Sequence, residues 1–254
     1  MRIVVTGGAG DLGSRVVREV TARGHQAVPA SRRTGVDLAT GEGLEAVLAG
    51  ADAVVHCADD TSLGDTVTVY GTRRLADTAA AHGVHLVHIS IVGIDEHPLA
   101  YYRRKLRAEQ GIEAAGGVAS VMRATQFHSL AAFFARTLST GPITLTIGDM
   151  AVQSVDTDFV AGRLADLALG ARPAAYARAT DVAGPDVLTV GELAGLLRAH
   201  RGASAPKVVR LPAVGGVLKA FAERRNVPLP GDAQTGGQAF ADWLALQPQR
   251  LSGR

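Results

Sequence analysis

The sequence predicts a doubly wound α/β fold, a parallel sheet covered by helices on both faces. Two observations predict it. Short apolar runs alternate with helix-length amphipathic segments over the first half of the chain, which is the pattern of repeated strand–helix–strand units. A glycine-rich loop also separates the first apolar run from the first helical pattern. With 254 residues, 47% of them hydrophobic and 20% charged, the chain can bury the core that this fold requires.

The strands and helices of the first half can be placed from apolar spacing and glycine stops. Strands are expected at residues 3–5, 26–30, 53–58, 85–90 and 119–123. Helices are expected at residues 12–23, 44–48, 65–81 and 101–115. Pro29 conflicts with a central position for the second strand, because proline cannot donate to a neighbouring strand.

The second half of the chain is less regular. We expect helices near 129–139, 158–169 and 191–201, strands at 142–147 and 176–182, and a proline-rich tail of helices. Residues 1–127 are therefore predicted to form the core, and residues 128–254 a smaller substrate lobe interleaved with it. The sequence has no repeat and no long flexible linker.

Composition excludes several classes of protein. The net charge is only +2 and aromatic residues make up 4%, which argues against nucleic-acid binding. No apolar run is long enough to span a membrane, and the amino terminus lacks the apolar region of a signal peptide. A single cysteine, Cys57, rules out an internal disulfide. A cytoplasmic protein is expected.

The glycine loop has the pattern Gly-x-x-Gly-x-x-Gly, formed by Gly7, Gly10 and Gly13. It follows the first strand and opens a helix, the context in which such loops bind a dinucleotide pyrophosphate. Glycine lets the main chain approach the phosphates closely, and the helix start supplies free N–H groups. The alternative is an ordinary glycine-rich turn between a strand and a helix.

Two arginines, Arg32 and Arg33, follow the second strand. NAD-binding proteins place an acidic residue here to bind the ribose 2′-hydroxyl. Guanidinium groups would instead bind a 2′-phosphate, so the sequence favours NADP(H) over NAD(H). The alternative is a pair of solvated surface arginines. Asp37 and Leu38, slightly further on, are candidates to flank the adenine.

A Tyr-x-x-x-Lys pair, Tyr101 and Lys105, lies at a helix start, eleven residues after Ser90, which ends a strand. Residues four apart share one helix face, so both side chains can point at one site. A lysine ammonium beside a phenol is expected to lower the phenol's pKa and make it a proton donor at neutral pH. The alternative is an exposed basic helix start with two packing tyrosines.

These motifs together resemble the short-chain dehydrogenase/reductase superfamily, and finer features resemble its NmrA-like and NAD(P)-binding epimerase-like branch. Residues up to about 200 carry the resemblance. The segments of the branch that recur here are Gly71-Thr72-Arg73-Arg74-Leu75, His88-Ile89-Ser90-Ile91-Val92-Gly93, Arg123-Ala124-Thr125-Gln126-Phe127 and Val155-Asp156-Thr157-Asp158-Phe159-Val160.

The resemblance implies a Rossmann fold and assigns roles to individual residues. For the cofactor it implies Gly7, Gly10, Asp11, Leu12 and Gly13 at the pyrophosphate, Arg32 and Arg33 at the 2′-phosphate, Asp37 and Leu38 at the adenine, Cys57 and Ala58 at the wall after the third strand, and Lys105 at the nicotinamide ribose. For the reaction it implies Tyr101 as acid, Ser90 orienting a substrate oxygen, and Gly93, Gln126 and Phe127 near the substrate. Tyr102 is the alternative to Tyr101. Thr68 stands where extended members of the superfamily carry an asparagine.

The function expected from these motifs is an NADP(H)-dependent oxidoreductase that reduces a carbonyl or quinone-like small molecule. The alternatives are an NADP(H)-binding sensor without turnover and an epimerase or dehydratase with bound NAD. A metal site is not expected, because His85 and His88 are three residues apart in a strand and face opposite sides. Substrate identity and oligomeric state stay open, although homodimers are common in the superfamily that the chain resembles.

Overall fold

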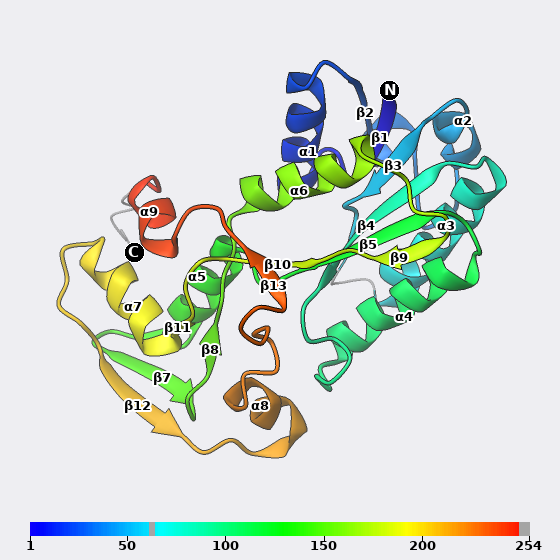
Figure 1. Ribbon diagram of the computed structural model, residues 1–254. Coiled ribbons are helices and arrows are strands. Elements are labelled where there is room, and N and C mark those ends of the chain that lie inside the picture. Colours follow the sequence, from blue (N-terminus) through cyan, green and yellow to red (C-terminus); the bar gives the residue numbers. More distant parts are fainter. Residues whose placement is uncertain (61–63, 249–254) are drawn as a thin grey trace. The chain divides into compact units, whose positions relative to one another are not determined.

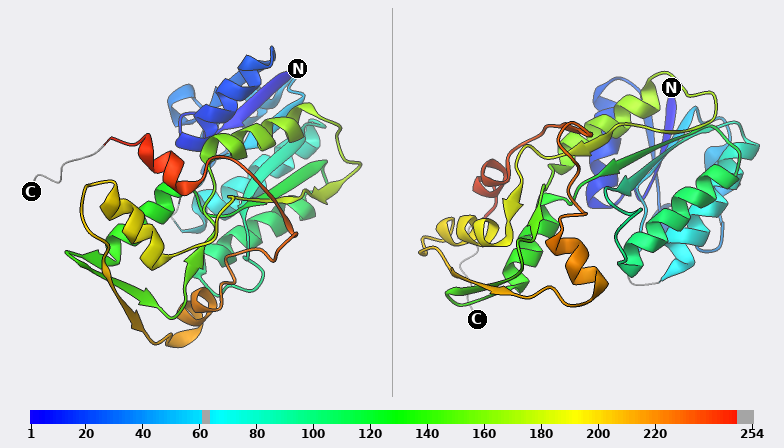
Figure 2. Two further views of the ribbon diagram at one scale, coloured as in Figure 1. Left: turned by 60° about the vertical axis from the view of Figure 1, so that its left-hand side comes forward. Right: turned by 60° about the horizontal axis from the view of Figure 1, so that its bottom comes forward.

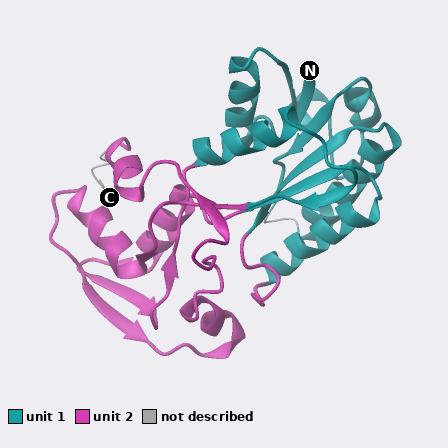
Figure 3. Ribbon diagram, in the orientation of Figure 1, with its two compact units in different colours: residues 1–91, 100–123, 157–180 teal, residues 92–99, 124–156, 181–254 magenta. Residues whose placement is uncertain are grey.

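The computed structural model describes residues 1–60 and 64–248, and the described chain divides into two compact units (Figures 1 and 3). The first unit comprises residues 1–91, 100–123 and 157–180, and the second comprises residues 92–99, 124–156 and 181–254. The sequence-based boundary at residue 127 therefore misplaces residues 157–180, which pack with the first unit.

A parallel sheet forms the centre of the first unit. Its strand order is β2-β1-β3-β4-β5, and β9 pairs with β5. The bounds of these strands are β1 Arg2–Thr6, β2 Gln26–Ala30, β3 Ala53–His56, β4 His85–Ile91, β5 Ala119–Ala124 and β9 Tyr176–Arg178. Strand β1 pairs in parallel with both β2 and β3, so that Ile3 lies opposite Ala27 on one side and Ala53 on the other. The predicted α/β fold is confirmed.

The position of β2 explains how a proline is accommodated within it. Among the described residues β2 pairs only with β1, where Pro29 lies opposite Val5. Proline removes one backbone donor, and an edge strand tolerates this loss because one of its sides has no neighbouring strand.

Helices cover both faces of this sheet (Figures 1 and 2). Helices α1 (Asp11–Ala22) and α6 (Thr157–Leu169) pack together on one face, and α2 (Leu44–Leu48), α3 (Thr72–Ala81) and α4 (Ala100–Ala114) lie on the other. One turn of π-helix, η2 (Thr66–Gly71), precedes α3. The apolar core beneath α2, α3 and α4 includes Val4, Val54, Leu75, Leu86 and Ile112.

Helix α4 is fixed to the sheet by a buried ion pair. The Glu109 carboxylate accepts two hydrogen bonds from the Arg123 guanidinium of β5, at 2.9 and 2.7 Å. Arg178 of β9 adds a longer contact of 3.9 Å to the same carboxylate. Because a two-pronged contact fixes both distance and orientation, this pair sets the position of the helix that carries Tyr101 and Lys105.

The second unit is built from short strands and helices. Strand β7 pairs with β6 and β12, β8 pairs with β11, and β10 pairs with β13. The bounds are β6 Ser139–Thr140, β7 Ile143–Ile147, β8 Ala151–Val152, β10 Asp181–Ala183, β11 Leu188–Thr189, β12 Lys207–Leu211 and β13 Ala233–Thr235. Its helices are α5 His128–Thr137, α7 Val190–Ala199, α8 Gly215–Ala222 and α9 Phe240–Ala245. The strands β12 and β13 correct the expectation of a purely helical tail. Within the described ranges, no helix is both long and apolar enough to cross a membrane.

Candidate active site

The glycine loop connects β1 to α1 and is shaped by close main-chain contacts. Gly7 has a φ of +70°, and a Cβ there would lie 2.7 Å from the Ala58 nitrogen. At Gly13, a Cβ would lie 2.2 Å from the Gly7 carbonyl oxygen. Both positions therefore require glycine, and the helix start can approach the loop only because these side chains are absent.

A cleft of about 410 Å³ opens beside this loop. The predicted cofactor residues that line it are Gly7, Gly10, Arg32, Arg33, Asp37, Leu38, Cys57 and Ala58. Four others, Asp11, Leu12, Gly13 and Lys105, do not line it. Leu12 and Gly13 are buried, and Asp11 pairs with Arg15 at 3.0 Å on the surface of α1. Gly13 therefore shapes the loop from behind and does not form part of the cleft wall.

The two arginines of the cleft come from a short 3-10 helix, η1 (Arg32–Thr34), directly after β2. Ser31 and Thr34 form a capping box around this turn, and both guanidinium-bearing residues are exposed. Neither arginine forms an ion pair with any residue that the structure describes. Two unpaired cations in a cleft beside a helix start form a favourable environment for a phosphate group.

The end of β3 contributes the opposite wall of the cleft through Cys57, Ala58, Asp59 and Asp60. Burial raises the pKa of the Cys57 thiol to about 12. The thiol is therefore protonated at neutral pH and does not act as a nucleophile.

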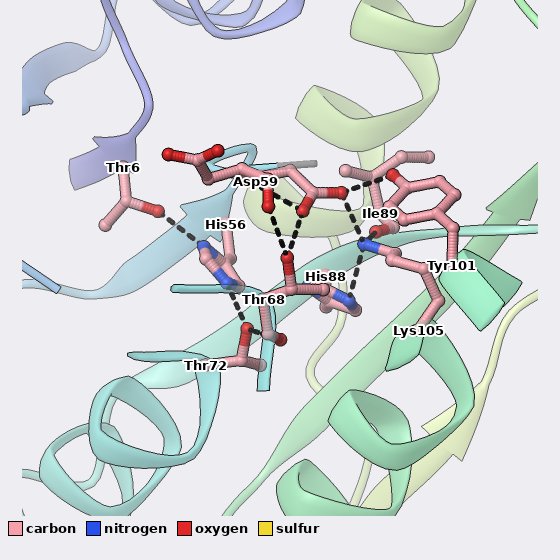
Figure 4. A network of polar contacts seen from close by, with 10 residues as sticks. Thr6, His56, Asp59, Thr68, Thr72, His88, Ile89, Tyr101 and Lys105 are labelled. Atoms are coloured by element: carbon pink, nitrogen blue, oxygen red, sulfur yellow. Dashed lines mark hydrogen bonds and ion pairs between the residues drawn. The ribbon is translucent and has the colours of Figure 1, made fainter. Parts of the chain in front are cut away.

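The Tyr101–Lys105 pair lies on α4 and converges on Asp59, which follows β3 (Figure 4). The Tyr101 hydroxyl donates to Asp59 Oδ2 at 2.5 Å, and Lys105 Nζ lies 3.6 Å from the same oxygen. Asp59 Oδ1 accepts a hydrogen bond of 2.5 Å from the Thr68 hydroxyl. The expected i, i+4 pair thus exists, and a carboxylate stands beside it.

The charge state of this cluster follows from its contacts. Burial opposes ionisation of Asp59, but Lys105, Thr68 and Tyr101 together outweigh it, so the pKa of Asp59 lies below its ordinary value. Burial and the Asp59 carboxylate raise the pKa of Tyr101 well above its ordinary value. The expectation of a lowered Tyr101 pKa is therefore wrong for this structure, because burial and the Asp59 carboxylate raise it.

A pair of neutral histidines, His56 and His88, lies beneath Lys105. The Thr72 hydroxyl donates to the Thr68 carbonyl, so it accepts from His56 Nε2 at 2.8 Å, and Thr6 donates to His56 Nδ1 at 2.7 Å. Burial, followed by the charge of Lys105, lowers the pKa of His56 to about 3. The same causes and His56 hold the pKa of His88 well below its ordinary value. Both rings are therefore uncharged at neutral pH.

The remaining predicted residues are distributed over both units. Ser90 lies in β4 with a buried hydroxyl that has no hydrogen-bond partner among the described residues. Tyr102 is buried, and its ring packs edge-on against that of Tyr101. Because the Tyr101 hydroxyl contacts a residue of the cleft wall, the structure favours Tyr101 over Tyr102. Gly93, Gln126 and Phe127 belong to the second unit.

Three histidines that lie close together in the sequence, His82, His85 and His88, have separate partners. His82 bonds to Glu45 at 2.5 Å, His85 bonds to Ser120 at 2.9 Å, and His88 contacts Lys105 at 3.4 Å. The described part of the chain holds no group of three or more His, Cys, Asp or Glu side chains that could bind a metal ion.

Asp59 and His56 are the two site residues that sequence reasoning missed. Tyr101 lies 42 positions from Asp59, and no motif joins them. One signal was available: parallel strands end at a common sheet edge, so residues after the third strand are expected near those after the first. Asp59 follows the predicted wall residues Cys57 and Ala58 directly.

Comparisons with known proteins agree with the fold. Residues 1–92 match the family model described as RmlD substrate binding domain. No curated protein matches the chain. One similar solved structure is a nucleoside-diphosphate-sugar epimerase from Staphylococcus aureus, with 16% identity over 96% of this chain and 100% of that chain and a TM-score of 0.73.

Two further structures have the same fold. A UDP-N-acetylglucosamine 4-epimerase from Bacillus cereus shares 18% identity over 96% of this chain and 94% of that chain, with a TM-score of 0.69. An NADPH-dependent quinone oxidoreductase from Escherichia coli, crystallised with NADPH, shares 17% identity over 98% and 92%, with a TM-score of 0.66. The chain has the fold of the NAD(P)-dependent reductases and epimerases, in agreement with the predicted superfamily.

Proposed function

We propose that the protein is an NADP(H)-dependent oxidoreductase that reduces a carbonyl or quinone-like small molecule. One observation carries this proposal: a single cleft joins the glycine loop, two unpaired arginines and Asp59, which contacts the Tyr101–Lys105 pair. The likeness to reductases supports it at the level of the fold. The bound cofactor would supply a hydride to the substrate.

Different residues of the chain would bind different parts of the cofactor. The N–H groups of Gly7 and Gly10 donate to the Ala30 and Gly7 carbonyls and shape the loop. The pyrophosphate would therefore be held by the N–H groups of the first turn of α1, which helix geometry leaves free. Arg32 and Arg33 would bind the 2′-phosphate, with Asp37 and Leu38 near the adenine. Lys105 would hold ribose hydroxyls.

The substrate side of the proposal rests on fewer contacts. Tyr101 would donate a proton to the substrate oxygen, and Ser90, whose buried hydroxyl has no described partner, would orient that oxygen. We keep Gly93, Gln126 and Phe127 as substrate-side residues of the second unit on the strength of the resemblance alone.

Cofactor preference provides the test of the arginines. Calorimetry should show NADPH binding at least about tenfold more tightly than NADH, a difference of about 1.4 kcal/mol. The double variant Arg32→Ala, Arg33→Ala should lose most of this preference while keeping its affinity for NADH, because NADH has no 2′-phosphate. Arg103→Ala serves as the control, since Arg103 is exposed on α4 and outside the cleft. Equal affinities of the wild type for NADPH and NADH would overturn the proposal.

An NADP(H)-binding sensor is the second candidate, and the hydrogen bond from Tyr101 to Asp59 favours it. A phenol whose pKa is raised by a neighbouring carboxylate is a poor proton donor. A wild-type protein that binds NADPH yet oxidises it with none of a panel of quinones and carbonyls would identify a sensor. NAD that stays bound through purification would instead favour an epimerase.

A further inference from the structure

The ammonium group of Lys105 faces three acceptors. Nζ lies 3.0 Å from the Ile89 carbonyl oxygen, 3.4 Å from His88 Nε2 and 3.6 Å from Asp59 Oδ2. The first two contacts are at hydrogen-bond distance, whereas the 3.6 Å contact with Asp59 is an ion pair beyond that distance. An ammonium group has three hydrogens, so one stays available beyond these two hydrogen bonds, and a ribose hydroxyl that accepts it would compete with the attraction of the Asp59 carboxylate.

The three acceptors differ in how easily they can be replaced. The Ile89 carbonyl belongs to the main chain of β4 and is fixed by the sheet. His88 is buried in the same strand, and among the described residues its Nε2 contacts Lys105 alone, so losing Lys105 would leave a buried acceptor unsatisfied. Asp59 makes the longest contact, and its side chain is 24% exposed at the cleft.

Asp59 also keeps other partners when Lys105 turns away. Its carboxylate accepts from the Tyr101 hydroxyl at 2.5 Å, from the Thr68 hydroxyl at 2.5 Å and from the Asp60 main-chain N–H at 2.8 Å. These donors hold the carboxylate in place (Figure 4), so the contact with Lys105 can be exchanged without leaving Asp59 unsatisfied.

We propose that Asp59 is a positioning residue of the candidate site: its carboxylate accepts the hydrogen bond from Tyr101 and forms an ion pair with Lys105. Lys105 binds the cofactor's ribose only when this ion pair is broken. This inference rests on the proposed function. Asp59 therefore competes with the nicotinamide half of the cofactor for Lys105. It does not compete with the adenine half, which the glycine loop and arginines would hold.

The competition can be measured by comparing two ligands. NADPH carries both halves, whereas adenosine 2′,5′-bisphosphate has the 2′-phosphate but lacks the nicotinamide ribose. Calorimetry on Asp59→Asn should show the affinity ratio of NADPH to the bisphosphate rising about fivefold, which corresponds to about 1 kcal/mol, the scale of a partly exposed ion pair.

Asp60→Asn is the matched control, because it removes one negative charge from the adjacent residue of the same cleft wall. If removing a negative charge simply reduces repulsion of the ligand phosphates, Asp60→Asn should raise the affinity for both ligands equally and leave the ratio of the two affinities unchanged. Asp59→Ser, which keeps a hydroxyl for Tyr101, provides a second variant in case Asp59→Asn does not fold. A ratio that stays constant or falls in the folded Asp59 variants would overturn the inference.

A spectroscopic measurement tests the contact directly, since the chain has only three lysines, Lys105, Lys207 and Lys219. Labelling lysine with ¹³C at Cε gives three side-chain signals, which Lys207→Arg and Lys219→Arg assign. The Lys105 signal should move in Asp59→Asn before any ligand is added. In the wild type it should move with NADP⁺ and stay in place with adenosine 2′,5′-bisphosphate.

The outcomes separate this inference from the proposed function. A wild-type protein that binds neither ligand would overturn both. A wild type that binds both ligands, with a Lys105 signal unmoved by Asp59→Asn, would overturn the role of Asp59 alone.

Discussion

The carboxylate of Asp59 changes what the Tyr-x-x-x-Lys pair means chemically. Lysine alone near a phenol would stabilise the phenolate, but here the phenol donates to an ionised carboxylate at 2.5 Å. Deprotonating Tyr101 would place its phenolate beside the negative Asp59 carboxylate. Proton donation by Tyr101 therefore depends on how the Asp59 carboxylate is neutralised or moved.

Variants of the pair test its part in the reaction. Lys105→Ala is expected to abolish NADPH oxidation with a quinone panel, because it removes the one buried ammonium at the site. Tyr101→Phe should slow oxidation without abolishing it, since hydride transfer does not require the hydroxyl. Stopped-flow absorbance of NADPH measures both rates. If neither variant changes the rate, the pair takes no part in turnover.

The pair itself was predictable from the sequence, whereas its environment was not. Tyr101 and Lys105 are four residues apart, so helical periodicity alone places them on one face. Asp59, His56 and Thr68 come from other elements, and only the fold brings them to Lys105. Local patterns therefore identified the reactive groups, but the pKa of Tyr101 depends on residues that those patterns do not connect.

At the scale of elements, the loop between β1 and α1 depends on the absence of side chains. Gly13→Ala would place its Cβ 2.2 Å from the Gly7 carbonyl oxygen, so the loop or the helix start must shift. We expect this variant to lose about 1–3 kcal/mol of stability and to bind NADPH and NADH with equally reduced affinity.

Gly195→Ala is the matched control for that prediction. Gly195 lies within α7, and an added Cβ would meet no atom within 4 Å. The variant should gain up to about 1 kcal/mol from helix propensity and keep its cofactor affinity. Urea denaturation measures the stability of the two variants, and calorimetry measures their cofactor affinity. A Gly13→Ala protein with wild-type stability would contradict the packing argument.

Most elements of the first unit were predictable because each carries its own periodicity and stop signals. Helix α6 was found near its observed position, but its assignment to the second lobe was wrong. Its partners lie on α1 and directly after it: Arg15 and Arg18 contact Asp158, and Arg23, which follows α1, pairs with Asp166 at 2.6 Å. A helix pattern reveals an apolar face but not which distant helix covers it.

At the scale of the whole molecule, buried neutral histidines make stability depend on pH. His56 and His88 are buried within the first unit, and burial holds the pKa of His56 at about 3 and that of His88 well below its ordinary value. In the unfolded chain both would titrate near 6.5. Below this pH the unfolded chain therefore binds protons that the folded protein does not, and acidification favours unfolding.

The free energy of unfolding should accordingly fall between pH 7.5 and pH 5. Each of the two histidines is expected to contribute a loss of about 2 kcal/mol, since one pKa unit corresponds to about 1.4 kcal/mol. Urea denaturation at fixed temperature measures the free energy of unfolding at each pH. As a control, this free energy should not change between pH 7.5 and pH 8.5 because of these histidines, since both are neutral there in the folded and the unfolded chain. In His56→Gln, whose side chain does not titrate, the decline should be smaller than in the wild type by about 2 kcal/mol. A wild-type free energy that stays constant down to pH 5, or an undiminished decline in His56→Gln, would show that these rings accept protons in the folded protein and that the network beneath Lys105 is not neutral.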